Sequence, residues 1–531
     1  MCHNHPSLER RVASLVHAHF EALPQRSKPT IHGNGLREWI PLSGIVLVTK
    51  VNTPEEALTC VAVATGAKCL PSSQIAQCSG LVLHDSHAEI LTLRAFNHWL
   101  LEECKSVLTE FNKKHVDNSC AGVLDEINQG SGDPLNCFGS RFLQWNLENT
   151  DLQEPIPWPP FRIKEDVKIW MYCSCAPCGD ASMELCMAAQ EDPTPWKLYV
   201  PETSNTENPG SQPQGLLNGR AHFSILGAVR RKPSRADAES TLSKSCSDKL
   251  AVKQATSILS FPTSLLVVPT SNAYISNIVL PAAELNRTGC DRSFGSGESG
   301  RMRPLNGRTW GTGHKADACF KFRPFEMTSL PMEEVEGMWK YGKPTAKSSE
   351  EKVKTGNVSA VWTAPPSNSP RPPFTSKWND IHSFSEPGGY KEFFRTPPTN
   401  LNETLINGVK QGYRLNSPGF KKASALSRAR MWALLGDISK LLDEGGLVSE
   451  QLGGTQTSSL TQIVHSAPSY GALKSQTAMG GYLQARAQVL QDVRLVLNNW
   501  IRNYGDDTWD MSVFDIPAKA KRQQLQSPKE S

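Results

Sequence analysis

The chain of 531 residues is longer than one simple domain requires, and a hydrophobic fraction of 38% with 38 glycines can supply a sizeable core. No apolar run approaches the roughly 20 residues that span a bilayer, no signal peptide opens the chain, and 14 irregularly spaced cysteines exclude a secreted disulfide framework. A net charge of +4 is compatible with RNA binding but excludes a polycationic coat protein. These properties predict a protein of a reducing compartment, cytoplasmic, nuclear or both.

The first part of the chain alternates helical and strand-like patterns. Apolar residues recur at helical spacing over residues 7–24, and β-prone runs follow at 44–50 and 59–65. Residues 81–90 read LVLHDSHAEI, where an apolar run ends in a polar turn and a helical pattern begins. His87 and Glu89 are therefore predicted in the first turn of a helix, with Asp85 or Ser86 as its N-cap.

Two half-motifs point to a metal. His87-Ala88-Glu89 has the form His-x-Glu, in which zinc deaminases use the His as a ligand and the Glu as a proton carrier. This tripeptide recurs by chance and is weak evidence alone. Downstream, a β-prone run from residue 168 enters Pro177-Cys178-Gly179-Asp180 before another helical stretch. Two helix starts in this order favour a zinc centre that includes His87 and Cys178.

A catalytic zinc takes three protein ligands and one water, so a third ligand is needed. The pattern Pro-Cys-x-x-Cys would place it at position 181, which is Ala181. Cys175 forms a Cys-x-x-Cys with Cys178, but it lies on a predicted strand, where cysteines are commonly small hydrophobes. Cys246, in SKSCSDKL (residues 243–250), is the better candidate.

The rest of the chain separates into polar insertions and C-terminal helices. Segments rich in Gly, Asn, Ser or Pro are predicted as disordered insertions at 105–165, 191–218, 285–315 and 341–400. Apolar positions recur at helical spacing over 426–442 and 482–500. We therefore expect an N-terminal helix and lead-in (1–43), one domain that carries the insertions (44–504), and a tail (505–531).

The three blocks HAE (87–89), PCGDA (177–181) and SCSDK (245–249) together resemble the zinc blocks of the adenosine-to-inosine RNA deaminases. Residues 230–237, RRKPSRAD, are similar to the Arg-x-Lys-Pro-Gly-Arg-Gly-Asp loop of the tRNA-specific branch, with Ser234 and Ala236 in place of two glycines. The likeness runs from about Gly44 to Trp500. It implies an α/β fold of the cytidine-deaminase type, with a mixed sheet flanked by helices and additional C-terminal helices.

The resemblance implies zinc-dependent hydrolytic deamination of adenosine to inosine in tRNA, at position 37 beside the anticodon of alanine tRNA. His87, Cys178 and Cys246 would hold Zn²⁺ and leave one position for water. Glu89 would take the water proton, supply it to the purine ring and help ammonia leave. An anticodon-loop base is already unpaired, so its extrusion costs less than flipping from a duplex.

The resemblance also suggests two sets of cationic residues. Lys68, Arg230, Arg231 and Arg235 are expected near RNA phosphates, with solvated surface charges as the alternative. Residues that enclose inositol hexakisphosphate in this family correspond here to Arg94, Lys249, Arg428, Tyr470, Lys474, Tyr482, Arg486 and Trp500. Leu93 and Val252 stand where double-stranded RNA editors have arginines. Asp85 and Lys232 would link this polyphosphate pocket to the zinc site.

Three rival functions remain at this point. An editor of double-stranded RNA is disfavoured by the absence of a visible duplex-binding module and by the loop at Lys232-Pro233. A non-catalytic, zinc-stabilised RNA-binding subunit would have no use for Glu89. A deaminase of free nucleosides is less attractive for a large chain with a basic loop. The sequence indicates no protein partner and no membrane association.

Overall fold

The computed structural model describes residues 6–31, 36–116, 139–146, 158–198, 224–232, 239–311, 320–336, 338–343, 353–377, 398–413, 415, 419–444, 460–475, 481–497 and 500–515. Within these ranges, no helix is both long and apolar enough to cross a membrane. The element order begins with α1 (Leu8–Glu21), which confirms the helix predicted over 7–24.

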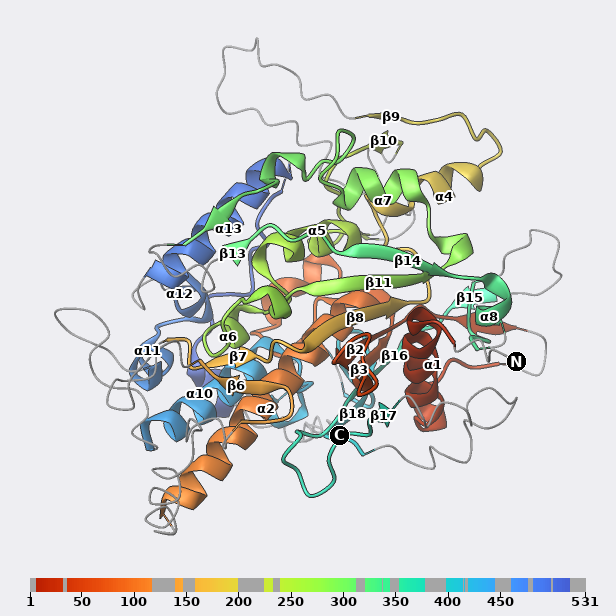
Figure 1. Ribbon diagram of the computed structural model, residues 1–531. Helices are drawn as coiled ribbons and strands as arrows, with labels where there is room; N and C mark the ends of the chain where they lie inside the picture. Colours follow the sequence, from red (N-terminus) through yellow and green to blue (C-terminus); the bar gives the residue numbers. More distant parts are fainter. Residues whose placement is uncertain are drawn as a thin grey trace, which may run out of the picture.

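A mixed nine-stranded sheet forms the centre of the molecule (Figure 1). Its order is β14 (Glu326–Leu330), β11 (Ile275–Pro281), β8 (Val167–Cys173), β2 (Leu42–Thr49), β3 (Ala57–Thr65), β16 (Val358–Thr363), β18 (Leu401–Ile406) and β19 (Val409–Lys410), while β17 (Ser376–Lys377) pairs with β3. The pairs β14–β11 and β11–β8 are parallel. All other pairs in this sheet are antiparallel. The predicted α/β fold with a mixed sheet is confirmed.

Helices cover the sheet on both faces. Every residue of β2 and β3 is buried, which requires cover on each side. On one side α1 lies across the strands so closely that a Cβ at Gly44 would be 2.5 Å from Val16 Cγ2. The long helix α2 (Ala88–Val116) packs against β2, β3 and β16, and α10 (Arg428–Glu444) packs on α2. The helix α5 (Cys246–Thr256) packs against α7 (Arg287–Phe294) and α13 (Gly481–Val496).

Shorter elements complete the described chain. Two-stranded ribbons are formed by β1 (Arg37–Trp39) with β15 (Val353–Thr355), β4 (Ala67–Cys69) with β5 (Asp85–His87), β6 (Leu143–Trp145) with β7 (Phe161–Ile163), β9 (Lys197–Leu198) with β10 (Ile225–Leu226), and β12 (Thr309–Trp310) with β13 (Phe320–Lys321). The remaining helices are α4 (Met183–Ala188), α6 (Phe261–Ser264), α8 (Met332–Glu336), α11 (Leu460–Ser466) and α12 (Tyr470–Ser475). The predicted C-terminal helices are confirmed as α10 and α13.

Several segments predicted as disordered insertions are regular where they are described. Residues 285–311, assigned to an insertion, contain α7, a 3-10 turn (Arg303–Leu305) and β12. Within 341–400, β16 is an inner strand of the sheet, between β3 and β18. Within 105–165, α2 continues to Val116, and β6 and β7 form a ribbon. These predictions are wrong for two reasons. Short apolar runs such as β16 and the β6–β7 ribbon are buried although polar sequence surrounds them. In 285–311, Arg292 and Arg301 are paired with buried carboxylates.

The other parts of the predicted insertions lie outside the described residues, namely 117–138, 147–157, 199–218, 312–315, 344–352 and 378–397, and so does the tail from 516. The first part of that tail, residues 505–515, was expected to be separate from the domain and is not. Trp509 packs directly on Gly80, where an added Cβ would be 2.1 Å from the ring. The Asp506 carboxylate accepts a hydrogen bond from the Gly80 N–H at 2.7 Å and contacts Arg428 Nη1 at 3.0 Å.

Candidate active site

The three predicted metal ligands meet at one point. His87 ends β5, Cys178 lies in the loop after β8, and Cys246 is the first residue of α5. His87 Nδ1 lies 3.6 Å from the Sγ of each cysteine. Cys175 lies beyond the end of β8, near Ser174 Oγ, and does not join this cluster among the described residues. One imidazole and two thiols within 4.8 Å of one another can hold a metal ion.

The two cysteine loops are locked together by backbone contacts. Gly179, with φ +108°, follows Cys178, and a Cβ there would lie 2.2 Å from Ser245 Oγ. This close approach requires glycine. The Ser247 N–H donates to the Cys178 carbonyl at 3.0 Å, while Ser245 caps α5 by accepting a hydrogen bond from the Asp248 N–H. The separation of the two thiols is thus set by packing between distant parts of the chain.

Two buried carboxylates, each two residues after one of the two cysteines, anchor these loops through ion pairs. Asp180 contacts Arg292 Nε through both carboxylate oxygens at 3.1 Å and also accepts hydrogen bonds from Ser293 Oγ and the Gly227 N–H. Asp248 contacts Arg301 Nη1 at 2.7 Å. Arg301 Nε donates to the Ser293 carbonyl, which connects the two pairs. Both arginines come from the segment 285–311, which therefore supports the metal cluster.

A third carboxylate, Asp85, lies two residues before His87 on β5. Lys232 Nζ lies 2.9 Å from Asp85 Oδ2 and 3.2 Å from Cys246 Sγ, and Lys249 Nζ also contacts Asp85. Burial alone would raise the pKa of Asp85, but the ammonium groups of Lys232 and Lys249 hold it well below its ordinary value. The predicted contacts among Asp85, Lys232 and Lys249 are present, and they place a fixed positive charge beside the Cys246 sulfur.

Glu89 lies in the first turn of α2 and is 4% exposed. The Cys246 thiol lies 3.4 Å from Glu89 Oε2, so the carboxylate faces the cluster. Burial and the nearby Cys178 thiol raise the pKa of Glu89 above its ordinary value. A hydrogen bond with Cys246, together with Lys232 and His87, lowers the pKa of Cys178 well below that of a free thiol. The site therefore favours a thiolate at Cys178 and a carboxyl at Glu89 that can carry a proton.

Comparison with known proteins places this arrangement in a family. The family model of the adenosine-deaminase (editase) domain matches residues 62–121 and 153–371, which contain Glu89 and the three candidate metal ligands. The chain belongs to the adenosine-deaminase (editase) domain family. It is accordingly a deaminase, as the resemblance implied.

The alignments with individual relatives differ in identity and in the share of each protein that they cover. It is 36% identical over 352 residues to the tRNA-specific adenosine deaminase 1 of Schizosaccharomyces pombe, covering 66% of this chain and 74% of the relative. The protein of the same name from Saccharomyces cerevisiae is 32% identical over 48% of this chain and 54% of the relative. The double-stranded RNA-specific editase B2 of Rattus norvegicus is 22% identical over 47% of this chain and 27% of the relative.

The residues predicted to contact RNA are placed differently from one another in the editase domain. Lys68 is partly exposed on β4, opposite Ser86 of β5. Arg231 is also partly exposed, whereas Arg235 lies outside the described residues. Arg230 is 5% exposed, and its guanidinium donates to the Ile225 carbonyl. The Arg230 side chain thus faces the interior of the domain, and its contact with RNA stays a prediction.

The residues predicted to enclose a polyphosphate form a cationic cluster behind the metal site. Arg94 on α2 donates to the Leu426 carbonyl at 2.7 Å, and burial and Arg428 lower its pKa. Burial with Arg428 and Arg486 lowers the pKa of Lys474 to about 7. The Lys474 side chain is nevertheless exposed, so an anion could reach it from solvent. Arg486 Nε is buried without a hydrogen-bond partner in the described part of the chain.

Some residues of the cationic cluster and some that support the metal site were not predicted from the sequence. Lys244 and Lys253 add to the cationic cluster, since burial and neighbouring cations lower the pKa of each to about 7. Lys244 Nζ lies 5.7 Å from the centre of the Trp500 ring, which ties the predicted Trp500 to this cluster. Arg292 and Arg301 were hidden in a segment assigned to an insertion. The one available signal was the repeated Cys-x-Asp spacing, Cys178 to Asp180 and Cys246 to Asp248.

Proposed function

We propose that this chain deaminates adenosine to inosine in tRNA, at position 37 beside the anticodon of alanine tRNA, with Zn²⁺ as its metal. The observation that carries the chemistry is the meeting of His87, Cys178 and Cys246 beside the Glu89 carboxylate. The tRNA substrate is supported by the relatives named tRNA-specific adenosine deaminase 1, which share 36% and 32% identity, against 22% for the double-stranded RNA editase of the rat.

The donor atoms fit zinc. One imidazole nitrogen and two thiol sulfurs are the ligand types that zinc prefers, and three protein ligands are typical of a catalytic site that leaves a fourth position open. Asp85 is near His87 but is already paired with two lysines, so it is not counted as a ligand. When bound, zinc would act as a Lewis acid that lowers the pKa of a water towards ~7.

The protein side chains supply proton transfer and charge balance. Glu89, which faces the cluster from the first turn of α2, would accept one proton from water and deliver it to the purine ring nitrogen. It would then transfer the remaining proton of the added hydroxyl to the amino group, which leaves as ammonia. Lys232, 3.2 Å from Cys246 Sγ, favours the thiolate form of that cysteine. Asp85 holds Lys232 in place and also accepts a hydrogen bond from the His87 N–H at 3.0 Å.

Inositol hexakisphosphate is proposed as a structural cofactor in the cationic cluster. Its members would repel one another without an anion, which is why burial and neighbouring cations lower the pKa of Lys474, Lys253 and Lys244 to about 7. A bound polyphosphate would satisfy donors such as Arg486 Nε. Lys249 reaches Asp85 from α5 and so connects this region to the metal site.

Unmodified alanine tRNA provides the direct test. We expect the purified protein to convert the adenosine at position 37, read by sequencing, while duplex RNA and free adenosine stay unconverted. Glu89→Gln should abolish conversion with about one zinc retained per chain, because the amide keeps the side-chain volume but cannot carry the proton. Cys246→Ala should lose both conversion and zinc, because it removes a ligand. Conversion of duplex RNA with no inosine in tRNA would refute the proposed substrate.

A further inference from the structure

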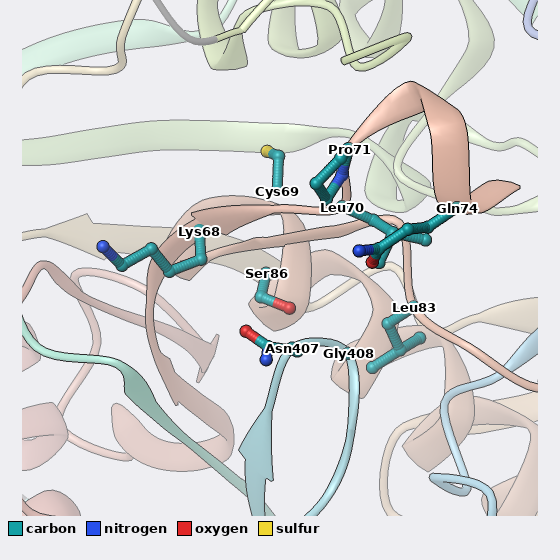
Figure 2. Close-up of a pocket in the computed structure, with 9 residues that line it drawn as sticks. All are labelled: Lys68, Cys69, Leu70, Pro71, Gln74, Leu83, Ser86, Asn407 and Gly408. Atoms are coloured by element: carbon teal, nitrogen blue, oxygen red, sulfur yellow. The ribbon is translucent and has the colours of Figure 1, made fainter. Parts of the chain in front are cut away.

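A pocket lined by residues of the β4–β5 ribbon lies next to the metal site but does not include the candidate metal ligands. Its volume is about 210 Å³, several times the roughly 30 Å³ that one water occupies in the liquid, so it can admit a ring-shaped group. Figure 2 shows the carboxamides of Gln74 and Asn407 and the Ser86 hydroxyl directed into it, with Lys68 extending along one edge. Leu70 and Leu83 contribute apolar wall.

The β4–β5 ribbon separates this pocket from the metal ligands. Lys68 pairs with Ser86 across the two strands, so both side chains lie on the same face of the ribbon. The neighbouring residues Asp85 and His87 point to the other face, where the metal cluster lies, and Cys69 Sγ reaches Asp85 there. A group bound in the pocket would therefore lie one strand's thickness from the reacting centre without entering it.

The polar side chains of the pocket have no internal role. Within the described part of the chain, Lys68, Gln74, Ser86 and Asn407 make no side-chain hydrogen bond or ion pair. Ser86 is only 5% exposed, and buried hydroxyls are normally paired. The Asn407-Gly408 turn has positive φ at both residues (+51° and +79°), and the Leu83 N–H donates to the Gly408 carbonyl, which anchors the backbone of the turn that carries Asn407. The structure holds these groups ready for an external partner.

The 3-10 helix that carries Gln74 (Ser72–Gln77) is anchored to the chain just before the block that contains Cys246. The Ser72 N–H donates to the Ser240 carbonyl at 2.9 Å, and the Ser73 N–H donates to Glu239 Oε1 at 3.3 Å. These contacts fix the position of the 3-10 helix relative to residues 239–240.

We propose that this pocket binds the base of an unpaired nucleotide that flanks the target adenosine. This inference rests on the proposed RNA substrate. Carboxamides pair with the donor and acceptor groups of base edges, and unpaired bases in RNA loops expose those edges. The apolar wall accepts the faces of the ring, and the Lys68 ammonium at the edge suits the phosphate of the same nucleotide. The pocket would thus hold the strand in register while the adenosine is in the metal site.

The test combines abasic substitution in the tRNA with variants of the full-length protein. Each nucleotide that flanks the target is replaced in turn by an abasic one, and binding is measured with Glu89→Gln protein. Gln74→Ala and Asn407→Gly remove a carboxamide each, and glycine retains the positive φ of the turn. Gln411→Ala is the control, because Gln411 is an exposed carboxamide just after the same hairpin and outside the pocket. Melting curves confirm that each variant folds.

We expect one abasic position to weaken binding by about tenfold in protein that carries only Glu89→Gln, and each pocket variant to weaken binding of intact tRNA to a similar extent. At that position the two losses should not add, since both remove one contact. Additive losses at every position, or pocket variants that bind like Gln411→Ala, would overturn the inference. If wild-type protein makes inosine in tRNA while no position shows this coupling, the pocket assignment fails and the proposed function stands. Absence of tRNA binding would refute both.

Discussion

Replacing Arg292 by methionine tests whether the segment 285–311 sets the geometry of the metal site. Arg292 and Asp180 are almost completely buried, with side chains 6% and 0% exposed. The guanidinium contacts both Asp180 oxygens at 3.1 Å, the Asp180 carbonyl at 2.7 Å and Glu184 Oε2 at 2.9 Å. Methionine removes these donors but fills much of the same volume, and it leaves the Asp180 charge buried.

The expected size of the effect follows from these contacts. Breaking a buried ion pair by removing one partner costs about 3–5 kcal/mol. Asp180 keeps hydrogen bonds from Ser293 Oγ and the Gly227 N–H, so we expect the lower end, about 3 kcal/mol. Because Asp180 lies two residues after Cys178, zinc affinity should also fall, by the roughly 10–100-fold typical of groups that support a metal ligand.

Chemical unfolding measures the stability, and competition with a chelator measures the zinc affinity. Arg287→Met is the matched control, since Arg287 is exposed on the same helix and, among the residues that the structure describes, its side chain donates only to the Met327 carbonyl. Adding Asp180→Asn to Arg292→Met should recover part of the lost stability, because no buried charge then remains. Zinc affinity within twofold of wild type in a folded Arg292→Met protein would show that this segment does not position Cys178.

Three other predictions address the site and its surroundings. Gly179→Ala should lower zinc occupancy, since its Cβ would lie 2.2 Å from Ser245 Oγ at a φ of +108°; normal zinc content by elemental analysis would contradict this. Lys232→Met should weaken zinc binding and shift the absorption of a cobalt-substituted site, because it removes the ammonium 3.2 Å from Cys246 Sγ; an unchanged spectrum would argue against that role. In protein freed of polyanion, Lys244, Lys253 and Lys474 have pKa values of about 7 in the folded state against roughly 10.4 when unfolded, so the unfolded chain binds more protons between these values. The melting temperature should therefore rise with pH in that window. Inositol hexakisphosphate should abolish this rise, and its affinity should fall as pH increases. Identical slopes of melting temperature against pH with and without it would refute its assignment to the cationic cluster.

The amino-acid sequence alone identified the candidate metal ligands and the secondary structure around them. His87, Glu89, Cys178 and Cys246 stand in short blocks whose residue types serve one chemistry, and each block coincides with a local change from an extended segment to a helix or turn. Periodicity also identified α1, α10 and α13, because the apolar residues on the buried face of an amphipathic helix recur at helical spacing in the sequence.

Only the tertiary structure decided which polar residues are internal. The segment 285–311 reads as an insertion, yet Arg292 and Arg301 are buried because Asp180 and Asp248, far away in the sequence, neutralise them. Arg230 reads as a surface cation but is turned inward. Burial of a charge depends on a partner that long-range packing brings close, and the local composition of a segment carries no information about such partners. For the same reason, the pocket formed by Ser86 and Asn407 could not be seen before β5 and the β18–β19 hairpin were placed side by side.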